Sequence, residues 1–83
     1  MRVIVKLYAT LGDCLPPGTK GNEVAIEVGD DVGIPEILDR FRVPPRMTKL
    51  VLVNGIFVAP EDRPGRRLKE GDQLAIWPPV AGG

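Results

Sequence analysis

The residues with the clearest chemical potential are the last two, Gly82 and Gly83. Neither has a side chain, so the α-carboxylate of Gly83 is sterically open, and both residues accept backbone dihedrals that other residues avoid. A narrow channel in another protein could admit such a tip, and the carboxylate is the only reactive group that the tip presents. The alternative is a frayed terminus without function, because chain ends are commonly poorly ordered.

The residues before the two glycines favour the first interpretation. Pro78 and Pro79 resist helix formation and hold a chain extended. Residues 78–83 would span roughly 20 Å at about 3.3 Å each. We therefore expect residues 1–77 to form the folded domain and residues 78–83 to form a flexible tail. The residues expected to thread into a partner are Pro78, Pro79, Val80, Ala81 and Gly82.

Length and composition exclude several other kinds of chemistry. A chain of 83 residues fits one domain near the lower size limit for a self-sufficient core. It has no histidine and a single cysteine, Cys14, so a zinc site, an internal disulfide or a histidine-activated nucleophile is not expected. No apolar run has transmembrane length and no charged-then-apolar leader precedes the domain, so we expect a cytoplasmic protein without a membrane partner.

The charges balance overall but not along the chain. Residues 1–39 hold three basic and seven acidic side chains, whereas residues 40–83 hold eight and four. Nucleic-acid-binding domains are basic over a whole face, so no nucleic-acid partner is expected. One loop is locally basic and either steers an acidic partner surface or is simply solvated. Its cations are Arg63, Arg66, Arg67 and Lys69.

Five segments rich in β-branched or aromatic residues predict strands. Between the third and the fourth, Asn54-Gly55 predicts a type I′ hairpin turn, since both residues tolerate positive φ. The segment 69–72 predicts a second tight turn before the last strand. The expected strands cover residues 2–9, 23–28, 49–53, 56–58 and 73–77.

One short helix is expected between the second and third strands. Apolar side chains recur at i, i+3, i+4 and i+7 from Ile34 to Phe41, which makes one helical stripe. Asp30 or Asp31 is expected to cap its first turn, and Pro44-Pro45 forbids continuation. The order β-β-α-β-β predicts a two-layer α+β domain, with a mixed sheet of four to five strands under the helix. The first and last strands are expected to be central neighbours.

Several of these features together resemble the MoaD/ThiS family of ubiquitin-like sulfur carriers. They are the strand order, the turn Val53-Asn54-Gly55, the pattern Leu68-x-x-Gly71-Asp72 and the ending Pro78-Pro79-Val80-Ala81-Gly82-Gly83. The resemblance covers essentially the whole chain, and its specific part is the ending, which is most similar to small subunits of molybdopterin synthase. It implies a β-grasp (ubiquitin-like) fold.

The resemblance also implies a role for the terminal carboxylate. An E1-like enzyme would adenylate Gly83 with ATP and Mg²⁺, and a sulfurtransferase would convert it to a thiocarboxylate. The large subunit of molybdopterin synthase would then receive the sulfur for molybdopterin, the ligand of molybdenum or tungsten. The chain itself would be a protein cosubstrate without a bound cofactor, not an enzyme. In the family, apolar residues at the positions of Tyr8, Phe57 and Trp77 meet the partners. Tyr8 and Trp77 also have the parity opposite to the expected core residues of their strands.

Departures from the family pattern leave the pathway open. The helix is shorter than in many synthase small subunits, and Trp77 stands where a smaller apolar residue is frequent. One alternative is a thiazole sulfur carrier in thiamine biosynthesis. Another is a ubiquitin-like modifier conjugated through Gly83 to lysines, and a third is a plain binding module with a passive tail. Cys14 has no activating base or cation nearby in the sequence, which favours a bystander thiol.

Overall fold

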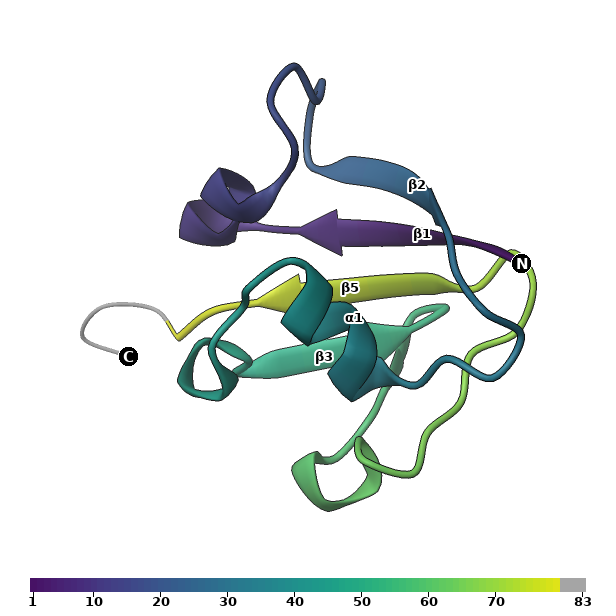
Figure 1. The fold of residues 1–83 in the computed structure, drawn as a ribbon. Helices are drawn as coiled ribbons and strands as arrows, with labels where there is room; N and C mark the ends of the chain where they lie inside the picture. The colour runs from purple at the N-terminus through teal and green to yellow at the C-terminus, as the bar shows by residue number, and fades with distance from the viewer. Residues whose placement is uncertain (80–83) are drawn as a thin grey trace.

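A mixed five-stranded sheet carries one helix on one face (Figure 1), as the computed structural model describes for residues 1–79. The spatial order of the strands is β2-β1-β5-β3-β4. β1 and β5 are parallel neighbours, and the other pairs are antiparallel. This is the predicted β-grasp arrangement. The elements are β1 Arg2–Leu7, β2 Glu23–Glu27, α1 Ile34–Arg40, β3 Leu50–Val53, β4 Ile56–Phe57 and β5 Gln73–Trp77.

In each central strand, every second side chain lies on the face of the sheet that α1 covers. Val5 pairs with Val24 on one side and with Leu74 on the other, and Val51 pairs with Ile76. A fully buried aliphatic side chain contributes about 1.5–3 kcal/mol, so this layer holds a helix too short to persist alone. The most deeply buried residues of the layer are Val3, Val5, Leu7, Ile34, Ile37, Val51, Val53, Leu74 and Ile76.

The two tight turns at one end of the sheet are joined by side-chain hydrogen bonds. Asn54 and Gly55 both have positive φ, 52° and 84°, as predicted for the hairpin turn. The Asn54 amide donates from Nδ2 to Asp72 Oδ1 at 2.9 Å and accepts at Oδ1 from the Gln73 N–H at 2.9 Å. Asp72 also accepts the Lys69 N–H at 2.8 Å, which closes the second predicted turn. We call this set of contacts the turn clip.

The start of the helix differs from the prediction. Neither Asp30 nor Asp31 caps α1, and the N-cap is Gly33. Its N–H donates to the Glu36 carboxylate at 3.1 Å, which satisfies one donor of the first turn. Gly33 also forms an isolated antiparallel bridge with Arg67. Asp30 and Asp31 lie in a turn, and the helix begins only after the extended Gly33, because the chain there pairs with a distant segment.

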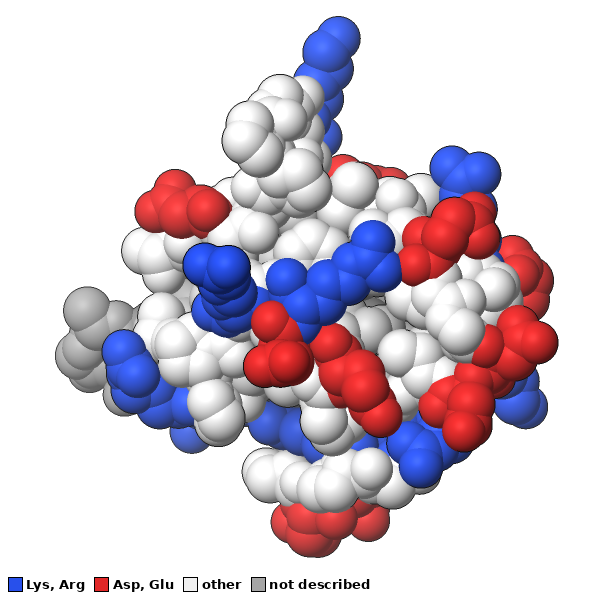
Figure 2. Space-filling view, in the orientation of Figure 1, with Lys and Arg blue, Asp and Glu red and all other residues white. Residues whose placement is uncertain are grey.

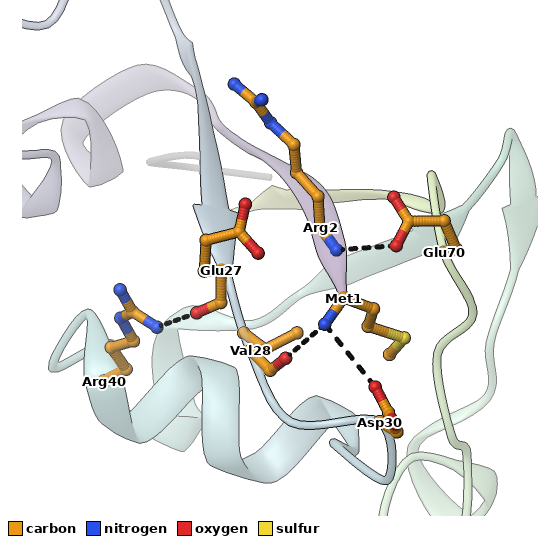
Figure 3. Close-up of polar contacts among 7 residues, drawn as sticks. All are labelled: Met1, Arg2, Glu27, Val28, Asp30, Arg40 and Glu70. Atoms are coloured by element: carbon orange, nitrogen blue, oxygen red, sulfur yellow. Dashed lines mark hydrogen bonds and ion pairs between the residues drawn. The ribbon is translucent and has the colours of Figure 1, made fainter.

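Charged groups tie the N-terminus to its neighbours. Figure 2 shows carboxylates gathered at the end of the molecule that holds the N-terminus in Figure 1. The Met1 amino group donates to the Val28 carbonyl at 2.6 Å and lies 3.6 Å from Asp30 Oδ1 (Figure 3). Arg40 of α1 donates from Nη1 to the Glu27 carbonyl at 2.8 Å. These contacts connect β1, β2 and α1 at one edge.

The connections contain three short 3₁₀ helices. The first strand ends at Leu7, earlier than expected, and the segment after it begins with η1 (Ala9–Cys14), whose Leu11 is buried in the core. The other two are η2 (Pro45–Met47) and η3 (Pro60–Asp62). Within residues 1–79, no helix has the length and apolar character needed to cross a bilayer.

We predict that the turn clip contributes measurably to stability. Asn54→Gly keeps the positive φ but removes both side-chain hydrogen bonds, and it should lower the free energy of unfolding by about 1–3 kcal/mol. Asn54→Ala should lower it further, because a non-glycine residue without a polar side chain is strained at positive φ. Urea unfolding monitored by Trp77 fluorescence measures both. Equal free energies of unfolding for the wild type and the two variants would show that the turn clip does not stabilise the fold.

Candidate functional site

The face of the sheet opposite α1 carries a continuous apolar surface. Leu52 of β3 pairs with Phe57 of β4 on one side and with Ala75 of β5 on the other, and Leu50 pairs with Trp77. Their parity is opposite to that of the buried Val51 and Val53, so their side chains lie on the open face. We call this surface the sheet patch. Its members are Tyr8, Leu50, Leu52, Phe57, Ala75 and Trp77.

Two aromatic rings form one end of the sheet patch. Tyr8 follows β1 and Trp77 ends β5, and because these strands are parallel neighbours their ends coincide. The rings stack with parallel planes and centroids 4.1 Å apart. The Tyr8 N–H also donates to the Ile76 carbonyl at 3.1 Å. The structure thus confirms that both rings face away from the helix, and such a pair contributes about 0.5–1.5 kcal/mol beyond its buried area.

Phe57 lies at the other end of the sheet patch and on the same face, since it pairs with Leu52. Its side chain is 53% exposed. Leu52 and Ala75 lie between it and the aromatic pair, and Ala75 is only 9% exposed although it faces away from the core. The sequence analysis missed Leu50, Leu52 and Ala75. Their alternation with buried residues was the available signal, but it identifies a patch only once the strand order is known.

The chain leaves the sheet beside the aromatic pair. β5 is central, and its last carbonyl, on Trp77, accepts the Lys49 N–H at 3.0 Å. Pro78 is buried and Pro79 is exposed, so the folded body includes the first of the two prolines. The predicted working tip, Val80, Ala81, Gly82 and Gly83, lies outside the described residues, and its role stays a prediction.

One cation of the basic loop is structural. Arg63 is only 8% exposed, so it is not a solvated side chain of that loop. Its Nε donates to the Val58 carbonyl at 3.1 Å and its Nη1 to the Thr48 carbonyl at 2.8 Å. The guanidinium thus connects the ends of two loops. The other three cations of the loop, Arg66, Arg67 and Lys69, are exposed.

Two further features of the described residues concern metal-binding and thiol chemistry. Within residues 1–79, no group of three or more histidine, cysteine, aspartate or glutamate side chains is placed to hold a metal ion. Cys14 is half-buried at the end of η1 and packs against the core.

The strand order β2-β1-β5-β3-β4, with one helix across one face of the sheet, defines a ubiquitin-like β-grasp protein. Comparison with protein families assigns the chain more closely. The model of the ThiS family matches residues 5–83, so this protein belongs to the ThiS family of ubiquitin-like sulfur carriers. Proteins of this family are small carriers or modifiers and are generally not catalysts themselves.

Solved structures agree with this assignment, whereas no curated protein sequence matches the chain. SAMP1 from Haloferax volcanii is 26% identical over the full length of both chains, with a TM-score of 0.69. The thiamine biosynthesis protein ThiS from Geobacter metallireducens is 18% identical, again over both full chains, with a TM-score of 0.66. A complex of subunits 1 and 2 of the molybdopterin-converting factor from Helicobacter pylori contains a chain 19% identical, fully covered, with a TM-score of 0.57. The last two support the fold alone.

Proposed function

We propose that this protein carries sulfur for molybdopterin biosynthesis on the carboxylate of Gly83. An E1-like enzyme adenylates the carboxylate with ATP and Mg²⁺, releasing pyrophosphate. A sulfur nucleophile supplied by a sulfurtransferase attacks the acyl carbon, AMP leaves with the bonding electrons, and a thiocarboxylate remains. The observation that carries the proposal is the central position of β5, whose last residue, Trp77, belongs to the sheet patch, so the chain leaves the sheet beside that patch.

The residue types at the end of the chain suit this chemistry. A carboxylate is a poor electrophile, and adenylation gives it a good leaving group. The activated acyl group must be protected from water, so each partner encloses it in a narrow site. Gly82 and Gly83 place no side chain beside the reacting carbon. Pro78 and Pro79 each fix their own φ and resist helix formation, which suits a segment that must enter a narrow site.

We propose the sheet patch as the docking surface for the enzymes that use the tail. Tyr8, Phe57 and Trp77 are large, partly exposed rings, and aromatic residues dominate the energetics of many interfaces. Subunit 1 of the Helicobacter pylori molybdopterin-converting factor is found in complex with subunit 2. By analogy, the large subunit of a molybdopterin synthase and the E1-like enzyme bind this chain in turn, since one tail enters one active site at a time.

The ending Pro-Pro-Val-Ala-Gly-Gly is the feature that favours the molybdopterin pathway over a thiazole carrier for thiamine. A second candidate function is protein modification, in which activated Gly83 forms isopeptide bonds with lysines of other proteins. The full-length likeness to SAMP1, a small archaeal modifier protein, favours it. Both functions use the same activation, so their products must be separated by experiment.

We predict that Gly82→Val blocks activation while leaving the fold intact, because the branched side chain obstructs an enclosed active site. The protein is incubated with the E1-like enzyme, ATP and a sulfur donor, and intact-mass analysis measures replacement of oxygen by sulfur. The rate should fall by at least about 100-fold, which corresponds to about 2.7 kcal/mol of activation free energy. Lys20→Val is the matched control, because it introduces the same side chain at an exposed position outside the tail and the sheet patch, and it should react normally.

Full thiocarboxylate formation on Gly82→Val would contradict the proposed role of the tip. So would native protein that retains residues beyond Gly83, because the acceptor carboxylate would then be absent.

We predict that Trp77→Ala weakens partner binding more than it weakens the fold. The ring is partly exposed and its loss removes one anchor of the sheet patch, so affinity for the synthase large subunit should fall by at least about tenfold, or about 1.4 kcal/mol. Ile56→Ala is the control, because Ile56 is 70% exposed but has the opposite parity on β4. Calorimetric titration measures binding and urea unfolding measures stability. Unchanged affinity together with a large loss of stability would refute the docking role.

Immunoblots of cell lysate with antibodies against this chain separate the two functions. Sulfur carriage predicts one band near the mass of the chain and recovery of its thiocarboxylate. A ladder of heavier species that disappears when Gly83 is deleted would instead establish conjugation to other proteins.

A further inference from the structure

We propose that a groove on the helix side of the molecule binds an acidic, apolar segment of a partner protein, separately from the sheet patch. The groove has a volume of about 540 Å³ and lies between α1, η2 and η3. Figure 1 shows α1 in front of the sheet, and the strand register places the sheet patch on the opposite face. We call it the helix-side groove.

The walls of the helix-side groove are largely apolar and stiff. Leu38 of α1 and Val43 line it from one side, and Pro45, Pro60 and Pro64 line it from the others. Each proline ring fixes its own φ, so the groove is formed before a partner arrives. A preformed site loses little conformational entropy on binding. A bulky aliphatic side chain is the group that such walls accommodate best.

The polar character of the groove comes from Arg63. Its hydrogen-bond acceptors are neutral, namely the Val58 carbonyl, the Thr48 carbonyl and the Thr48 hydroxyl at 3.1, 2.8 and 3.3 Å. Its Nη2 is buried and makes no hydrogen bond, and no carboxylate within residues 1–79 lies in ion-pair contact with it. A buried cation without a counter-charge is unfavourable. A small shift of the guanidinium towards an incoming carboxylate would supply a charge-assisted bond.

The opposite wall fixes the orientation of the occupant. Asp39 of α1 also lines the groove and is exposed. It repels an acidic group, so the carboxylate of the partner lies on the Arg63 side and the aliphatic side chain lies over Leu38 and Val43. Because the groove is partly open to solvent, a peptide chain can enter it and continue out of it. A partner held here leaves the sheet patch and the tail free for a second protein.

The test uses two blocked peptides of the same length, one of alternating leucine and glutamate and one of leucine and glutamine. They are titrated into the full-length protein labelled with nitrogen-15. The glutamate peptide should shift the amide signals of Leu38, Val43 and Thr48 but not those of Leu52 and Ala75. It should bind at least about tenfold more tightly than the glutamine peptide.

Two variants isolate the charges. Asp39→Asn removes an exposed carboxylate that makes no side-chain hydrogen bond or ion pair among the described residues, and it should tighten binding of the glutamate peptide about threefold. Arg63→Met should abolish the preference for glutamate over glutamine. Arg63 also joins two loops, so Arg63→Met could fail to fold. In that case the affinity of Asp39→Asn for the glutamate peptide tests the proposal.

Three outcomes would overturn the proposal. They are the absence of saturable shifts, equal affinity for the two peptides, and shifts confined to the sheet patch. Isovalerate, a small aliphatic carboxylate, serves as a further probe. If it binds as tightly as the glutamate peptide, the groove is a small-anion site and not a docking surface for a protein segment.

Discussion

The parallel ladder between β1 and β5 is the contact on which the rest of the molecule depends. It runs from Ile4 opposite Gln73 to Leu7 opposite Ile76, and it joins strands from the two ends of the chain. Closing so long a loop has an entropic cost that local contacts do not offset. Burial of the side chains on both strands must offset it. The same ladder brings Tyr8 against Trp77 and sets where the chain leaves the sheet. Core, docking surface and tail exit are thus consequences of one pairing.

The two faces of the sheet divide the apolar residues of a small domain between stability and recognition. Alternate residues of β1, β3 and β5 form the core under α1. The sheet patch holds the remaining apolar residues, including Phe57, which is 53% exposed. A contiguous apolar surface on a monomer marks an interaction site more often than a scattered one. The docking role that we propose for the sheet patch gives these exposed side chains a function.

Arg63 has a structural role, and in our proposal it also attracts a partner's carboxylate. Arg63 holds two loops through carbonyl oxygens, and this fixes the walls of the helix-side groove. The same arrangement leaves its charge without a counter-ion among the described residues. Nothing in the local sequence distinguishes Arg63 from the exposed Arg66 and Arg67. The burial follows from where Thr48 and Val58 lie in the folded chain, and that depends on the β3–β4 hairpin and its flanking loops.

The sequence by itself determined the features that obey short-range rules. Alternation of apolar residues defined the strands and their parity, the Asn54-Gly55 pair defined a turn with positive φ, and the last residues defined the family resemblance. Tertiary structure alone decided the start of α1 at Gly33, the link from Asn54 to Asp72, and the union of Leu50, Leu52 and Ala75 with the aromatic rings. Periodicity and dihedral preference act over a few residues, whereas these contacts join segments far apart in the chain. Their free energy exists only once the sheet has assembled.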